Sequence, residues 1–175
     1  MFSNPAGNAR DAAATYTANL LALLGDLDPL LILAETPEWL EGAIRGVPEE
    51  RLRRPEAPGK WSALSVLQHL ADSEIVYGYR IRLIVAQDEP EIAGYDQDLW
   101  ARRLRYDEDD PQRVLLELRV MRERNLRFLG FLSPEDRQRA GEHSERGRET
   151  VEHIVRLLGA HDLVHRRQIR RILGS

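Results

Sequence analysis

The sequence contains no cysteine among its 175 residues. This absence excludes a disulfide framework, a thiol nucleophile and any zinc or iron–sulfur centre with cysteine ligands. A bound metal must therefore be held by nitrogen and oxygen. A strong charge of one sign is also lacking, because 25 Lys and Arg residues stand against 29 Asp and Glu residues, for a formal net charge of −4. The chain thus has no overall attraction to nucleic acid or to an anionic membrane.

Long apolar runs are lacking as well. The most apolar region, Leu20 to Leu33, is interrupted by Asp26, Asp28 and Pro29 well short of a membrane-spanning length. The first fifteen residues lack the basic start and apolar run of a secretory signal. We therefore expect a cytoplasmic protein that binds neither a membrane nor nucleic acid. With 42% hydrophobic residues, the chain can bury the core of one domain.

Helical spacing recurs along the chain, and no segment favours a strand. Thr36 followed by Pro37, Ser62, and Asp110 followed by Pro111 are typical helix starts. The stretch 46–60 has three prolines and two glycines, so we expect a connection with at most one short turn. The polar run 143–149 is expected to be a loop. The expected helices cover residues 10–25, 36–45, 62–87, 97–104, 110–130 and 149–172.

These long amphipathic segments predict an all-α fold, a four-helix bundle with an additional short N-terminal helix. Residues 1–34 are expected to form a helical extension that packs on the bundle, and residues 35–175 the bundle itself, within one single domain. Inward side chains of facing helices in such a bundle can share a metal ion.

Three histidines are the candidate metal ligands. His161 and His165 are spaced i, i+4, which stacks two imidazoles on one face of the last long helix, and His69 faces the core from the helix over 62–87. Three imidazoles leave at least one position open for water or substrate, as in a catalytic rather than a structural site. The alternative is a non-catalytic bundle, metal-binding or metal-free, whose histidines are polar core residues.

Several residues around the three histidines are further candidates for the site. Asp72, Ser73 and Glu74 lie one turn beyond His69, and although Ser73 most nearly shares its direction, a packed or solvated helix face is favoured. Tyr77, Tyr79, Tyr95 and Tyr106 could line a pocket, yet aromatic residues at helical spacing are usually core. None of these residues is assigned a catalytic role.

Four more residues complete the set of candidates. Asp162 stands where a zinc protease HExxH signature has glutamate, so that signature is set aside, and an interhelical or surface salt bridge with an arginine is favoured. Gln168 could form a hydrogen bond near the site or pack in the bundle. His143 and His153 lack a partner pattern and are predicted not to be ligands, with His143 in a loop that could approach the site mouth.

The strings PGKWSALSVLQHLADSE and HSERGRETVEHIVRLLGAHDLVHRRQI closely resemble the DinB-like superfamily, which includes the YfiT-type metal-dependent hydrolases. The resemblance covers about residues 35 to 173. It implies a bundle of up-down-down-up topology, often dimeric, with one divalent metal on three histidines whose positions match His69, His161 and His165. Relatives of this kind include thiol-dependent S-transferases and a maleylpyruvate isomerase.

The function implied by this resemblance is a metal-dependent enzyme that acts on a small molecule. A hydrolase would activate water, and an S-transferase would activate a low-molecular-weight thiol; both need the same ligands. Zinc and nickel suit three imidazoles, and manganese or iron is allowed. We expect a homodimer.

Overall fold

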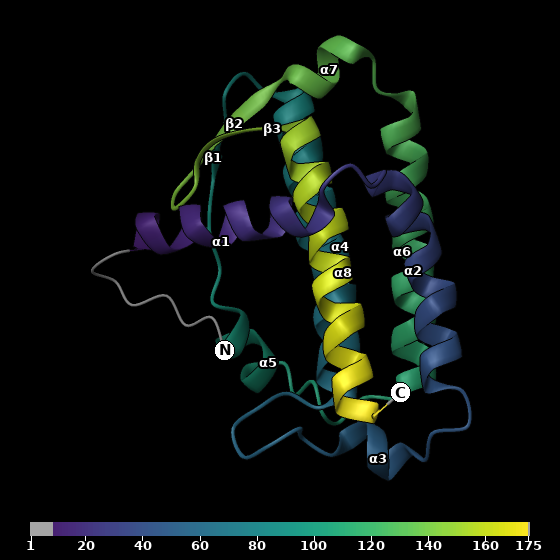
Figure 1. Ribbon diagram of the computed structural model, residues 1–175. Coiled ribbons are helices and arrows are strands. Elements are labelled where there is room, and N and C mark those ends of the chain that lie inside the picture. The colour runs from purple at the N-terminus through teal and green to yellow at the C-terminus, as the bar shows by residue number, and fades with distance from the viewer. Residues whose placement is uncertain (1–8, 175) are drawn as a thin grey trace.

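The computed structural model describes residues 9–174, with side chains from residue 13. Its long helices α2 (Pro29–Ile44), α4 (Ala63–Ala86), α6 (Pro111–Phe131) and α8 (Val151–Leu173) stand side by side as a bundle (Figure 1). In Figure 1, α4 and α6 run upward, whereas α2 and α8 run downward. In chain order the four helices run down, up, up and down, which is the up-down-down-up arrangement viewed from the opposite end. The expected four-helix bundle is confirmed.

Shorter elements surround the bundle. Helix α1 (Ala9–Leu24) extends from the left of the bundle to α8 and lies across its axis, and α3 (Glu49–Arg53), α5 (Gln97–Arg103) and α7 (Pro134–Gln138) lie in the connections (Figure 1). Leu20 and Leu24 of α1 pack against Leu157 and Ala160 of α8. The expected N-terminal helix therefore packs on the bundle through apolar contacts.

The helix starts at Ser62 and Asp110 are confirmed. Ser62 Oγ accepts a hydrogen bond from the Ser65 amide at 3.0 Å, and Ser65 Oγ accepts one from the Ser62 amide at 3.3 Å, which satisfies two amides at the start of α4. Asp110 accepts bonds from the first amides of α6. The last helix starts at Val151, two residues later than expected, with Thr150 as its N-cap.

The expected helix start at Thr36 is wrong. Helix α2 begins at Pro29, where Asp28 accepts a hydrogen bond from the Leu30 amide at 2.8 Å, and Pro37 lies inside the helix. Thr36 instead donates from its hydroxyl to the Ile32 carbonyl at 2.8 Å. Residues 34 and 35, between which the boundary was expected, both lie within α2.

Pro37 is tolerated because its missing N–H is replaced. A proline leaves the carbonyl four residues earlier without its usual helical donor. Here that carbonyl belongs to Leu33, and Nη1 of Arg122 on α6 donates to it at 2.6 Å. A residue that normally ends helices therefore anchors α2 to α6.

A small sheet also departs from the sequence expectation. Strands β1 (Glu91–Ile92), β2 (Ala140–His143) and β3 (Gly147–Thr150) pair in the order β1-β2-β3, parallel and then antiparallel. The expected absence of strands is wrong, and residues 143–149 belong to a hairpin rather than a loop. Strands of two and four residues are too short for a readable alternation. The sheet fixes the segment after α4 against the hairpin.

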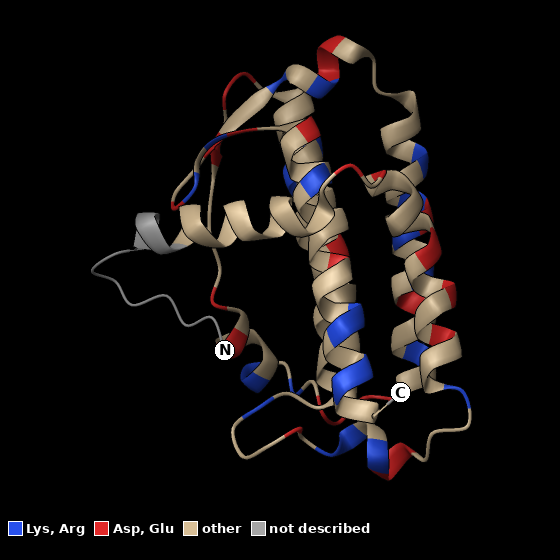
Figure 2. Cartoon of the chain, in the orientation of Figure 1, with Lys and Arg blue, Asp and Glu red and all other residues tan. Residues whose placement is uncertain are grey.

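Within the described residues, no single helix is both long and apolar enough to cross a membrane. Only the bent pair Ala13–Leu24 and Pro29–Ile44, which meet at 84°, has the required combined length and composition. Basic residues gather along the second half of α8, as Figure 2 shows, and Arg170 and Arg171 occupy its last turn. Cations at this end are favoured by the helix dipole.

Candidate metal centre

His69, His161 and His165 meet in the core between α4 and α8. Nε2 of His161 lies 2.9 Å from Nε2 of His69 and 3.1 Å from Nε2 of His165. The candidate ligand atoms of all three residues fall within 4.8 Å of one another. The side chains are buried, with exposed fractions of 1%, 6% and 8%. The structure therefore brings together the three residues that the sequence singled out.

The surroundings keep these imidazoles neutral. Burial lowers the pKa of His69 and of His161 well below the usual value, and lowers the pKa of His165 to about 4. The positive charge that each ring would carry if protonated also disfavours protonation of its neighbours. Trp61 covers the cluster, with its ring centroid 4.9 Å from that of His69. Neutral imidazole is the form that binds a metal.

The donor atoms fit a divalent ion. Gln168 Oε1 accepts a hydrogen bond from His165 Nδ1 at 2.8 Å. The proton is therefore on Nδ1, and Nε2 of that ring has a free lone pair for a metal. Nδ1 of His69 and Nδ1 of His161 are buried without a hydrogen-bond partner in the described part of the chain. Nitrogens on one ion, with bonds of about 2.0–2.1 Å, lie roughly 3 Å apart, close to the observed separations. Of the two alternatives given for Gln168, the structure shows the hydrogen bond near the site.

A buried ionic network stands behind the histidines. Arg122 of α6 pairs with Asp162 of α8 through Nη1 at 2.7 Å and with Glu74 of α4 through Nε at 2.8 Å. Asn125 donates to Glu74 Oε2 at 2.9 Å. Asp162 directly follows His161, so the network holds α8 against α4 beside the candidate ligands. The interhelical salt bridge predicted for Asp162 is confirmed, and its carboxylate is committed to Arg122 rather than to a metal.

The sequence analysis did not identify Arg122 or Asn125. They follow Leu118 at i+4 and i+7 and precede Leu129, so they lie on the same face of α6 as buried leucines. Polar residues within an apolar stripe were the available signal. Glu74, favoured as part of a packed or solvated face, is buried and paired.

The remaining candidates lie around the site but outside the cluster. Ser73 donates to the His69 carbonyl at 2.7 Å, which is a packing role. Asp72 accepts a hydrogen bond from the buried Tyr106 hydroxyl. His143 is buried at the end of β2 rather than in a loop, and His153 lies one-third exposed near Glu149. Neither histidine is within the three-residue cluster.

A separate groove of about 600 Å³ lies between α2 and α6. Glu38, Arg119 and Glu123 line it with both signs of charge, and none of the three histidines contributes. Arg122, which also binds Asp162, is among the lining residues. The groove is therefore separate from the histidine cluster, and Arg122 is the residue that it shares with the buried ionic network.

Comparison with known proteins supports the arrangement. Residues 32–169 match the DinB superfamily. A protein of Oceanobacillus iheyensis named "Putative metal-dependent hydrolase" is 28% identical over 137 residues, which cover 76% of this chain and 78% of that protein. YfiT of Bacillus subtilis, with the same description, is 27% identical over 114 residues, or 65% of this chain and 64% of YfiT.

The solved structure of Bacillus subtilis YfiT is described as a probable metal-dependent hydrolase with an unusual four-helix bundle topology. It superposes on this chain with a TM-score of 0.75 at 25% identity, and covers 83% of this chain and 86% of its own. The match to the family extends from α2 into α8 and includes all three clustered histidines. The chain belongs to the DinB superfamily.

Proposed function

We propose that this chain is a metal-dependent hydrolase for a small molecule, with one divalent ion held by His69, His161 and His165. The observation that carries the proposal is the convergence of three buried, neutral imidazole nitrogens within 4.8 Å. The names of the relatives described above support the same activity. Because the cluster is more than nine-tenths buried, a small substrate suits it better than a polymer.

The protein's own residues prepare this site. A divalent ion would supply Lewis-acid polarisation and would lower the pKa of water or of a thiol. Burial keeps the three imidazoles unprotonated, Gln168 fixes the orientation of His165, and the Trp61 ring packs against His69. Arg122 holds α8 in register through Asp162. Such fixed ligands remain in place through a reaction without reorganising.

A thiol-dependent S-transferase is the second form of the proposal, since a metal ion on the same three histidines would activate a low-molecular-weight thiol in place of water. Zinc or nickel is proposed as the ion; manganese and iron are also compatible with three imidazoles. The homodimer and the cytoplasmic location stay predictions; sedimentation at micromolar concentration tests the first.

Metal analysis of protein purified without an affinity tag tests the site. Wild type, incubated with zinc, nickel or manganese and then desalted, is expected to carry one ion per chain. The His161→Ala variant is expected to lose it. His153→Ala is the matched control, because this second histidine of α8 is one-third exposed and outside the cluster. Wild-type protein without a stoichiometric ion under all three conditions would contradict the proposal.

Turnover assays separate the enzymatic forms from the non-catalytic alternative. Ester and amide substrates, with and without added thiols, are expected to be converted only by metal-loaded protein. If chelation lowers only the thermal stability and no substrate of either class is turned over, the bundle is a metal-stabilised interaction protein. His161→Ala should abolish turnover without changing the helical content.

A further inference from the structure

A buried guanidinium with no carboxylate partner among the described residues lies beside Tyr77 and Tyr95. Arg80 of α4 is only 4% exposed. Its Nη2 donates to the Ala93 carbonyl at 2.7 Å, and its guanidinium carbon lies 5.5 Å and 5.9 Å from the ring centroids of Tyr77 and Tyr95. No Asp or Glu among residues 13–174 comes within 4.0 Å of it. A buried charge of this kind is costly unless it is paired.

The neighbouring carboxylate is already used. Arg146, in the hairpin turn, binds Glu149 through Nε at 2.6 Å and Nη2 at 2.8 Å. Glu149 is 1% exposed, so its two oxygens are enclosed with that guanidinium. Arg80 and Arg146 are close enough for their charges to oppose each other, since both burial and Arg146 lower the pKa of Arg80. Glu145, whose charge also acts on Arg146, is only partly buried. Arg80 is therefore the buried guanidinium of this region that has no carboxylate contact among the described residues.

His143 adds an unused donor to the same region. Its Nδ1 accepts hydrogen bonds from the amides of Glu145 at 3.1 Å and Arg146 at 3.4 Å, so the ring proton of the neutral form resides on Nε2. That Nε2 is buried and has no partner in the described part of the chain. Burial, with the charges of Arg146 and Arg80, lowers the pKa of His143 to about 4, so the ring stays a neutral donor.

Helix α4 connects this region to the metal site. His69, Ser73 and Tyr77 follow at intervals of four residues on one face, and Arg80, eleven residues after His69, returns to that face. The Arg80 guanidinium lies over the ring of Tyr77, which stands nearly one turn closer to the histidines on the same helix. The Tyr77 ring lies 6.3 Å from the ring of His161 and also contacts Arg80. Tyr77 thus links the guanidinium to the cluster.

We propose that Arg80, with His143 and Arg146 beside it, binds the carboxylate of a small organic acid whose reactive part lies at the three-histidine site. The second half of this proposal rests on the proposed function; the first half does not. A guanidinium fork matches two carboxylate oxygens. Arg146 is held by Glu149, so Arg80 offers a single guanidinium fork, which suits a monoanionic carboxylate better than a dianionic phosphate. Tyr77 and Tyr95 supply aromatic walls for the organic part.

Binding of a simple acid to metal-free protein tests the subsite. Propionate is titrated into ¹⁵N-labelled, chelator-treated protein at constant ionic strength, with chloride and inorganic phosphate as comparison anions, and backbone amide shifts are followed. We expect saturable shifts at Ala93, Glu145 and Arg146 with propionate, smaller ones with phosphate and none with chloride. Equal shifts with chloride, tighter binding of phosphate, or shifts confined to other parts of the chain would overturn the assignment.

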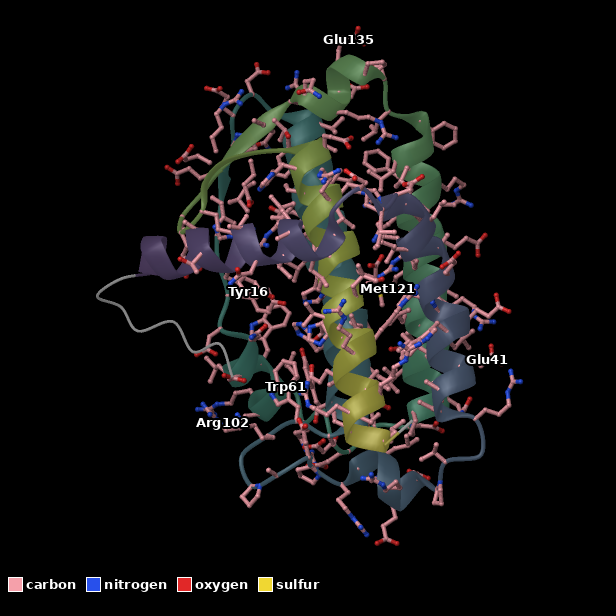
Figure 3. All side chains as sticks on the ribbon, viewed as in Figure 1. Tyr16, Glu41, Trp61, Arg102, Met121 and Glu135 are labelled. Atoms are coloured by element: carbon pink, nitrogen blue, oxygen red, sulfur yellow. The ribbon has the colours of Figure 1, made fainter. Side chains whose placement is uncertain are left out.

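Variants give predictions of opposite sign. Arg80→Met should raise the dissociation constant for propionate at least about tenfold, the loss expected for one charge-assisted hydrogen bond, and Arg80→Lys should recover part of it. Glu149→Gln should lower the constant, because it frees Arg146. Arg102→Met is the control: it removes the same charge from an exposed side chain that points away from the bundle (Figure 3) and should leave the constant unchanged.

These arms keep the two proposals separate. All titrations use metal-free protein and an unreactive acid, so a failure of the metal proposal does not alter them. Circular dichroism checks the fold of each variant; if Arg80→Met does not fold, Glu149→Gln decides, since unchanged or weaker binding there overturns the subsite. Metal bound by wild type without any propionate binding would leave the hydrolase proposal standing and remove this one.

Discussion

The Arg122→Met substitution would leave Glu74 and Asp162 buried without their shared counter-charge. Arg122 is 2% exposed, its partners have fully buried side chains, and its contacts reach α2, α4 and α8 from α6. Removing one partner of a buried ion pair costs about 3–5 kcal/mol, because the charge left behind is uncompensated. A domain of this size has roughly 5–15 kcal/mol of stability in total. We therefore expect the variant to be folded only marginally near neutral pH.

The loss should depend on pH in a defined direction. Burial raises the pKa of Glu74, and the Arg122 charge opposes that rise, so the substitution raises the pKa further. A carboxyl with a raised pKa in the folded state binds protons there more readily than when unfolded. The variant should therefore regain stability as the pH falls toward the unfolded value of 4.5. Urea unfolding at about pH 8 and about pH 5.5 should show the larger deficit at the higher pH.

Arg119→Met is the matched control, since it removes the same side chain one turn earlier on α6. Arg119 is 48% exposed and pairs with Glu41 at the surface, so its loss should cost no more than about 1 kcal/mol. The reasoning is refuted if the two variants lose similar stability, or if the Arg122 deficit stays constant between the two pH values. Either result would show that the network is not charged as described.

Three further predictions concern the fold. Metal-free protein should lose stability as the pH falls from about 6.5 toward about 4. The buried histidines, His143 and His165 among them, have lowered pKa values and take up protons only on unfolding. A urea midpoint that does not change over this range would contradict the prediction. Gly159→Ala should lower the free energy of unfolding by about 1–3 kcal/mol, because the new Cβ would lie 2.8 Å from Pro29 Cβ. Gly130→Ala on α6, where nothing lies within 4 Å of the new Cβ, should raise it by about 0.4–1 kcal/mol. Chemical denaturation of both variants tests this contrast. Ser62→Ala should cost about 1–2 kcal/mol and lower the melting temperature, since the hydroxyl caps α4 and donates to Asp107 at 2.6 Å; an unchanged melting temperature would argue against the cap.

Much of the bundle could be predicted because its signals are local. A cap such as Ser62 and the apolar spacing of α4 depend on residues within one helix, and the observed start matches the prediction. The i, i+4 pair of His161 and His165 likewise follows from one helix. The approach of His69 from α4 required the resemblance as well as the spacing, since no local pattern says which helices face each other.

The sheet and the start of α2 could not be read in the same way. Strands of two and four residues carry no periodicity, and Gly141 of β2 is close-packed, since a Cβ there would lie 2.8 Å from Ile92 Cδ1. At Pro37 the sequence predicted a helix start that does not exist, because proline is typical of the first helical position. Its place inside α2 depends on a donor from another helix, which is not visible near it in the sequence.

Contacts between helices also explain why polar residues near the site were the hardest to predict. Arg122 compensates for Pro37 by donating to the Leu33 carbonyl, and it also binds Asp162 next to His161. Replacing Pro37 with a residue that has an N–H would give the Leu33 carbonyl a second donor. That N–H would compete with Nη1 of Arg122, the side chain that positions the helix of His161 through Asp162. Arg80 is the converse case, a buried cation that no described carboxylate neutralises. In this bundle, a buried charge with partners on several helices fixes the geometry of the site, and one without a carboxylate partner indicates where an anionic ligand would bind.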